Sequence, residues 1–257
     1  MTTMNSILEK IANAPSLDFG TIFSDSFDLF KKTWVQGFLL QIFTFIMVLP
    51  FIFLLYAPLI GIYISAASSG SQDPEAFKAY FAGLGIAYLS LFFIGVLILI
   101  VISMALQAGF FRIMKQLDFN EPVQTSDFFY YLKGKYFGKM IILMLASIFI
   151  GSVAVLLCVL PIIYAMVPLS FFTLVFAFNP ELSAGEIITA SFKLGNKKWL
   201  LVFGLIFIAS LLAQIVGTLL CGIGILVTAP FVYHPVYLVY KSVIGFDDEQ
   251  PKSHIVA

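Results

Sequence analysis

Charged residues are missing from four long runs of this chain, and their absence constrains the fold more than any other feature. No Asp, Glu, Lys or Arg occurs in residues 33–72, 79–111, 140–180 or 199–240, which hold 40, 33, 41 and 42 residues. A helix that spans the hydrocarbon core of a bilayer needs about 20 apolar residues. Each run is therefore long enough for at least one membrane-spanning helix.

The composition agrees with a membrane environment. Of the 257 residues, 61% are hydrophobic and 11% are charged, whereas a soluble domain has about 25% charged residues. A soluble fold of this size would leave too much apolar surface in water. We therefore predict an all-α fold, a polytopic helical bundle in a membrane. The net charge of zero and the lack of a long Lys/Arg run give no basis for nucleic-acid binding.

Two of the charge-free runs are too long to be single spans. One helix over residues 140–180 would be about 60 Å long, against a hydrocarbon core of about 30 Å. Pro161 lies near the middle of this run, and Gly222 with Gly224 lies near the middle of 199–240. Such residues break helices, so we predict a hairpin in each run. The six predicted spans cover about residues 34–56, 83–106, 136–158, 161–178, 199–221 and 225–241.

The basic residues support six spans. With six spans, every Lys and Arg except Lys78 lies on one side of the membrane, which is 13 of the 14. Cytoplasmic loops carry such an excess of positive charge. Four spans would instead move Lys193, Lys197 and Lys198 outside. We therefore predict that both termini are cytoplasmic and that the protein lies in a bacterial inner membrane.

A short amphipathic segment precedes three of the predicted spans on the cytoplasmic side. The third of these segments begins with a predicted capping box, in which Ser183 and Glu186 each bond the other's backbone. Helices of this kind suit the membrane interface, although packing in a protein core is the alternative. We expect aromatic residues at the span entries to act as interfacial anchors: Trp34, Tyr136 and Trp199. The apolar residues of the three segments are Ile22, Phe23, Phe27 and Phe30; Phe128, Phe129 and Leu132; and Ile187, Ile188 and Phe192.

The sequence also repeats itself. Residues 26–34 match residues 191–199 at a shift of 165, and residues 156–158 match 219–221 at a shift of 63. We predict three parallel copies of one unit, in which an interfacial helix and a basic turn lead into a hairpin. Chance similarity between apolar segments is the alternative. The predicted units cover residues 17–117, 125–179 and 183–243, within a single membrane domain at 17–245, between a cytoplasmic leader at 1–16 and a polar tail at 246–257.

These motifs resemble those of a known group of bacterial membrane proteins. The Ser-Phe-x-Leu motif ahead of Trp199, the turn at 220–225 and the Pro- and Tyr-rich segment at 229–233 carry the resemblance. The chain is similar to the YciC-like integral membrane proteins and to the membrane domain attached to some glycerophosphodiester phosphodiesterases. The function of that membrane domain is unknown. In the fused enzymes the chemistry belongs to a separate soluble domain, so the resemblance implies no catalytic residue here.

Few side chains suggest chemistry. The two Cys and two His residues show no metal-ligand spacing, and no nucleotide-binding or hydrolase motif occurs. We therefore predict no catalytic residue, cofactor or metal. The charge-free spans argue against an ion-coupled pump. Cys158 and Cys221 are either buried thiols or a disulfide. The polar residues at membrane depth are predicted to bond neighbouring helices, or else to line a substrate cavity: Gln41, Gln107, Gln214 and His234.

The sequence thus predicts a class of protein more sharply than an activity. Our leading hypothesis is a non-catalytic scaffold, assembly or envelope-associated factor that acts through membrane partners. The alternative is a transporter or binding protein for a lipid or another apolar small molecule. An intramembrane enzyme is a third, weaker reading. The expected partners are membrane lipids and other membrane proteins, and no nucleic acid.

Overall fold

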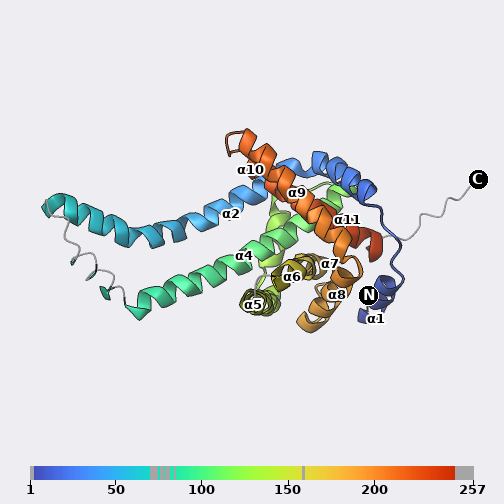
Figure 1. Cartoon of the computed structure of the whole chain (residues 1–257), viewed down its shortest axis with the longest axis horizontal. Helices are drawn as coiled ribbons and strands as arrows, with labels where there is room; N and C mark the ends of the chain where they lie inside the picture. Colours follow the sequence, from blue (N-terminus) through green and yellow to red (C-terminus); the bar gives the residue numbers. More distant parts are fainter. Residues whose placement is uncertain are drawn as a thin grey trace, which may run out of the picture. The chain divides into compact units, whose positions relative to one another are not determined.

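A computed structural model describes residues 3–69, 75, 78, 82–83, 85–157 and 160–246 of the chain. Every element within these ranges is helical, which confirms the all-helical prediction for them. Figure 1 labels the elements, with η marking 3-10 helices. They are α1 (Met4–Ala12), α2 (Phe19–Ser69), α4 (Ile86–Asp118), η1 (Thr125–Leu132), α5 (Gly134–Leu156), α6 (Leu160–Ser170), α7 (Phe172–Phe178), α8 (Ala184–Lys197), α9 (Trp199–Leu219), α10 (Ile225–Thr228), η2 (Ala229–Val232) and α11 (Tyr233–Val243).

Five helices of the described residues are long and apolar enough to cross a membrane. The chain is therefore a membrane protein with several long apolar helices. The sixth predicted span, at 225–241, is divided into α10, η2 and α11, because Pro230 stands in the 3-10 turn between the two α-helices. The five helices cover Phe19–Leu54, Tyr88–Asp118, Gly134–Leu156, Leu160–Phe178 and Trp199–Leu219.

The chain forms two compact units. One comprises Met1–Gln41 with Met104–Ala257, and the other comprises Ile42–Ser103. The long helices α2 and α4 each contribute residues to both units. The polar residues considered below lie in the first unit, apart from those of the α2–α4 hairpin.

The three amphipathic segments that precede predicted spans, called approach segments from here on, differ from one another in form. The first predicted segment is continuous with its span, because α2 runs unbroken from Phe19 to Ser69. The second is a 3-10 helix, η1, in which the backbone N–H of Gln124 donates to Asp127 at 2.9 Å. The third is α8, and the predicted capping box is confirmed: the Ser183 N–H donates to the Glu186 carboxylate at 2.8 Å, and the Glu186 N–H donates back to Ser183 Oγ.

The buried face of the first approach segment differs from the aromatic stripe in the sequence. Ser26 and Thr33 are fully buried, whereas Phe27 and Trp34 are 40% and 47% exposed. The Thr33 hydroxyl lies 3.1 Å from the Leu29 carbonyl oxygen and also contacts His234, whereas the buried Ser26 hydroxyl donates to the carbonyl of Ile22, four residues earlier, at 2.7 Å. This local bond lets a small polar side chain lie inside a helix contact without an unpaired donor.

Close approach between helices depends on small residues. A Cβ added at Gly195 in α8 would lie 2.9 Å from Pro168 Cα in α6, and one at Gly37 in α2 would lie 3.0 Å from Pro230 Cβ. In α4, a Cβ at Gly109 would lie 2.4 Å from the Phe128 carbonyl oxygen. These contacts set how α8, α2 and η1 pack on their neighbours.

In the described part of the second unit, α2 and α4 pair as a hairpin. The Tyr88 hydroxyl donates to the carbonyl oxygen of Leu54. Gly95 lies against the ring of Phe51 with no room for a side chain. Many of the described large apolar side chains of this unit are exposed; for example Phe53, Tyr63 and Phe93 are 68%, 77% and 63% exposed.

The prolines act differently from one another. The helix α2 continues without a break through Pro50. Pro168 and Pro230 do precede breaks, at Phe171 and in η2. The sequence Asp73-Pro74 is typical of a helix start, and it lies outside the described residues, as do Cys158 and the tail from 247 onward.

Candidate functional site

The helix α11 carries several fully buried polar residues of the first unit, among them His234 and Tyr237. Its residues from His234 to Tyr240 are all buried. The Nδ1 atom of His234 lies 3.1 and 3.2 Å from the carbonyl oxygens of Pro230 and Phe231. A carbonyl only accepts, so Nδ1 carries the ring proton and donates to them. The other nitrogen, Nε2, then accepts from the Thr33 hydroxyl at 2.6 Å.

Aromatic rings surround this His–Thr pair. The His234 ring lies 5.4 Å from Phe30, 6.2 Å from Phe110 and 5.8 Å from Phe231, measured between ring centroids. These rings come from α2, α4 and η2. Since both nitrogens of the ring have partners, His234 joins these elements without leaving an unsatisfied polar atom in an apolar environment.

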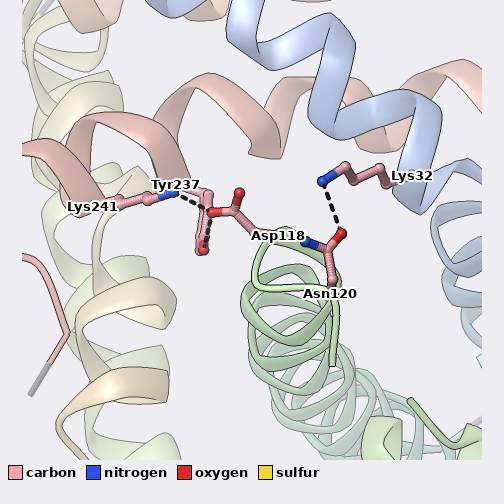
Figure 2. Close-up of polar contacts among 5 residues, drawn as sticks. All are labelled: Lys32, Asp118, Asn120, Tyr237 and Lys241. Atoms are coloured by element: carbon pink, nitrogen blue, oxygen red, sulfur yellow. Dashed lines mark hydrogen bonds and ion pairs between the residues drawn. The ribbon is translucent and has the colours of Figure 1, made fainter. Parts of the chain in front are cut away.

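The C-terminal end of α11 is joined to the end of α4 by charge. Lys241 Nζ lies 2.7 Å from Asp118 Oδ2, and the Tyr237 hydroxyl donates to the same oxygen at 2.9 Å. Figure 2 shows both contacts converging on Asp118, with Lys32 of α2 donating nearby to Asn120 at 3.3 Å. The Asp118 and Lys241 side chains are 16% and 30% exposed, so water screens their attraction only in part.

A recess of about 210 Å³ borders this ion pair. Three carboxylates and two lysines line it in a mixed arrangement, and Asp28 is already paired with Lys31 at 2.8 Å. Such alternation of charge fits a network of internal ion pairs and favours no single charge of ligand. The lining residues are Asp25, Asp28, Leu29, Lys32, Asp118, Leu238 and Lys241.

Further polar contacts join α7 to its neighbours. Asn179 donates from Nδ2 to the Tyr240 hydroxyl at 2.7 Å and to the Val175 carbonyl at 3.1 Å. The Tyr131 hydroxyl of η1 donates to the Ala177 carbonyl oxygen, and burial raises the pKa of Tyr131 above its ordinary value. Tyr131 is therefore a neutral donor at every physiological pH.

The three glutamines singled out in the sequence do not come together in one site. Gln41 in α2 and Gln107 in α4 are half-buried. Gln214 in α9 is exposed, and its amide donates to Thr218 of the same helix at 3.3 Å. Of the four predicted intramembrane polar residues, His234 makes the interhelical hydrogen bond that the sequence suggested for all of them.

The three predicted interfacial anchors occupy different environments. Trp34 is 47% exposed on α2, and Trp199 is half-buried, where its indole N–H donates to the Tyr164 carbonyl at 3.1 Å. Tyr136 is 7% exposed and packs against Tyr131, with ring centroids 5.2 Å apart. Tyr136 thus contributes to the protein core at the start of α5.

Sequence reasoning missed the ion pair and the tyrosines. Asp118 is 119 residues from Tyr237 and 123 residues from Lys241 in the sequence, so no local pattern pairs it with them. One signal was present in the sequence. Asp118 lies shortly after the end of the second charge-free run, and Lys241 is the first charged residue after the fourth, so each stands at the end of a predicted span. Within the described ranges, no group of three or more His, Cys, Asp or Glu residues is placed to hold a metal ion.

A family model matches residues 20–163, which is more than half of the chain. Its description is Protein of unknown function (DUF4013). The chain belongs to the DUF4013 family. No curated protein and no solved structure matches it. The DUF4013 match includes Thr33 and Asp118, whereas their partners on α11 lie beyond it. The resemblance to YciC-like proteins and to the phosphodiesterase membrane domain stays an expectation.

Proposed function

We propose that this DUF4013 protein is a non-catalytic, multi-pass scaffold of a bacterial cytoplasmic membrane that acts by binding partner membrane proteins. The observation that carries the proposal is the exposed apolar surface of the α2–α4 hairpin. Phe53, Tyr56, Ile60 and Tyr63 of α2 recur at three- and four-residue spacing and are 68%, 51%, 48% and 77% exposed. They form one stripe along the helix.

Aromatic residues make this stripe suited to another helix. Helices associate in lipid chiefly through van der Waals contact, because lipid tails are as apolar as leucine. Aromatic rings supply large, rigid contact areas, and a tyrosine hydroxyl adds a hydrogen bond. The hairpin Ile42–Ser103 is a compact unit by itself. We therefore assign the stripe to a partner helix, with lipid as the competing occupant in the test below.

The proposed topology has six spans and both termini in the cytoplasm. The Lys241–Asp118 ion pair supports it, because it holds the end of α11 beside the end of α4. The end of α4 carries Arg112 and Lys115, which favour the cytoplasmic side. Since α9 crosses the membrane once between Lys198 and Leu219, the chain must cross a second time for Lys241 to lie on the same side as Lys198. The divided segment from α10 to α11 is then the sixth span.

The second hairpin has comparable support. Lys139, near the start of α5, donates to the Pro180 carbonyl oxygen just after α7. Tyr131, just before α5, donates to the Ala177 carbonyl oxygen near the end of α7. These contacts join the two ends of the segment and favour an even number of crossings between them. The predicted hairpin of α5 with α6 and α7 agrees with that number.

The pattern of buried residues supports the proposed internal repeat. In the three approach segments the aligned positions are buried: Ser26 and Leu29 in α2, Phe128 and Tyr131 in η1, and Ser191 and Leu194 in α8. These pairs are related by the shifts of 63 and 165 found in the sequence. The helices α5 and α9 also end at equivalent positions, 156 and 219.

Packing between the proposed copies follows one rule. Each approach segment, or the helix that continues it, lies against the second half of another copy's hairpin. The segment η1 contacts α4 at Gly109, α8 contacts α6 at Gly195, and α2 contacts η2 at Gly37. Aromatic pairs accompany the contacts, with Phe128 on Phe110, Phe192 on Phe172 and Phe27 on Phe231. The three contacts link the copies in a cycle, which a tandem repeat of one unit would produce.

Photo-crosslinking tests the scaffold proposal. Benzoyl-phenylalanine is placed at Phe53 or Tyr63 of the stripe, and at Phe149 or Phe207 as matched controls, which are 70% and 55% exposed on α5 and α9. We expect a discrete protein adduct of one mass from the stripe, and lipid adducts alone from the controls. Lipid adducts alone at all four positions would contradict the scaffold and favour the alternative, a protein that handles lipid or another apolar molecule.

A further inference from the structure

A second feature of the first unit is a groove between the helices α1 and α8. The two helices lie side by side (Figure 1), and Ile7 and Ile11 of α1 are buried at 0% and 4% exposure. Beside this contact the surface opens into a groove of about 560 Å³. Its volume lies in the range of small-molecule sites, about 300–1,000 Å³. The lining residues are Leu8, Ile11, Ala12, Lys193, Asn196 and Lys197.

The two walls of the groove differ in chemistry. Three apolar residues of α1 form one wall, and three polar residues of α8 form the other, each set at the i, i+3, i+4 spacing that aligns side chains along a helix. None of the lining residues that the structure describes is acidic. The groove is therefore apolar on one side and cationic on the other.

The lysines of this wall are available for a ligand. In the described part of the chain, neither Lys193 nor Lys197 has an ion-pair or hydrogen-bond partner. The neighbouring Lys198 is already engaged, because it donates to the Pro15 carbonyl oxygen. Asn196, which lines the same wall, accepts from the Tyr164 hydroxyl at 2.6 Å, and this bond orients its amide.

The groove stands next to a span entry. The helix α8 ends at Lys197, and the apolar helix α9 begins at Trp199. The Trp199 ring stacks on Phe203 at 5.0 Å, and tryptophan and lysine at such an entry are typical of the lipid headgroup level. A ligand that reaches this groove from the bilayer would arrive with its headgroup at the lysines.

From these observations we infer that the groove binds an anionic phospholipid. Its phosphate would lie between Lys193 and Lys197, and its glycerol and first methylene groups would lie along Leu8, Ile11 and Ala12. An anionic headgroup is favoured over a zwitterionic one, because the described lining has no carboxylate to receive a choline or ethanolamine ammonium group. This inference goes beyond the scaffold proposal and rests on residues of the first unit, whereas the stripe belongs to the second.

Native mass spectrometry of the full chain tests the assignment. The protein is purified in detergent and titrated with phosphatidylglycerol or phosphatidylcholine of the same acyl chains. We expect one phosphatidylglycerol to be retained in preference to phosphatidylcholine. Near an anionic headgroup each lysine contributes about a five-fold gain in affinity. The double variant Lys193→Gln with Lys197→Gln should therefore lose on the order of twenty-fold in affinity for phosphatidylglycerol.

Two further variants separate the groove from general basicity. Lys133→Gln with Lys135→Gln removes the same charge from another exposed span entry and should retain the lipid. Ala12→Phe leaves every charge in place and fills the groove from the exposed side of α1, and it should lose the lipid. The thermal melting temperature of each variant verifies that it is folded.

Three results would overturn the inference. The first is equal retention of the two lipids by the wild type. The second is an equal loss in the Lys133/Lys135 variant, which would indicate attraction to the basic face as a whole. The third is displacement of phosphatidylglycerol by millimolar inorganic phosphate, which would make the ligand a free anion instead of a lipid. A negative crosslinking result at Phe53 and Tyr63 would leave the groove untouched, so the two proposals fail separately.

Discussion

His234 and Thr33 illustrate how a buried polar pair can hold helices together in an apolar protein. The ring is fully buried, and its two nitrogens bond the η2 carbonyls and the Thr33 hydroxyl. The hydroxyl also lies 3.1 Å from the Leu29 carbonyl, but it has a single proton. Because Nε2 has no other donor, the proton goes to the histidine.

Removing the hydroxyl should therefore destabilise the protein. Thr33→Val keeps the shape of the side chain and leaves Nε2 of His234 without a donor, which should lower the free energy of unfolding by about 1–2 kcal/mol. The measurement is reversible unfolding in a mixed detergent. Thr189→Val is the control, because this exposed hydroxyl bonds only its own helix at Gly185 and should cost almost nothing. Equal losses in both variants would argue against the His–Thr bond.

The Asp118–Lys241 ion pair allows a charge-swap test. Lys241→Met would leave the partly buried Asp118 with the Tyr237 hydroxyl alone, and we expect a loss of about 1 kcal/mol or more in stability. The swap of Asp118→Lys with Lys241→Asp should recover part of that loss in the same unfolding assay. Lys31→Met serves as the control, because its pair with Asp28 is about 70% exposed and should contribute little. If the swapped variant recovers none of the lost stability, the direct ion pair is contradicted.

At the scale of single elements, the glycine contacts decide how helices approach. Gly195→Ala would place a methyl group 2.9 Å from the Pro168 backbone, so we expect a loss of about 1–3 kcal/mol in unfolding free energy. Gly185→Ala lies in the same helix and meets nothing within 4 Å. It should be neutral or stabilising by up to about 1 kcal/mol. Thermal melting of the two variants in parallel compares them, and similar melting temperatures would contradict the α8–α6 contact.

The elements differ in how far the sequence predicted them. Local signals were reliable: the Ser183–Glu186 capping box starts α8 as expected, and the turn near Gly222 follows α9. The buried face of the first approach segment was not predicted, because Ser26 and Thr33 are polar and look exposed in a sequence. The Ser26 hydroxyl is satisfied within its own helix and the Thr33 hydroxyl by His234, details that hydrophobic periodicity does not reveal.

The candidate site was harder to predict than the elements. His234 stood out as a polar residue in an apolar segment, but its partner Thr33 lies 201 residues away. Gln214 looked equivalent in the sequence, yet it is exposed and bonds within its own helix. Which polar side chain points inward depends on the rotation of each helix about its axis. In a helix that is apolar all round, the sequence contains little information about that rotation.

For the whole molecule, the proposed topology rests on charge and on contacts between distant residues. A reporter fused after Asn179 should be cytoplasmic, because Lys139 near the start of α5 bonds the next residue, Pro180. A fusion after Gly222 should be on the opposite side, since this residue lies in the turn that follows α9. A periplasmic signal after Asn179 would contradict the second hairpin.

The most direct test of the account concerns the divided segment from α10 to α11, because it distinguishes six spans from five. Alkaline phosphatase and green fluorescent protein are fused in turn after Phe246, just beyond α11. With six spans this position is cytoplasmic, so we expect the fluorescent fusion to be bright and the phosphatase fusion to be inactive. An active phosphatase together with a dark fluorescent fusion would leave α10–α11 on the far side and contradict the three-hairpin account.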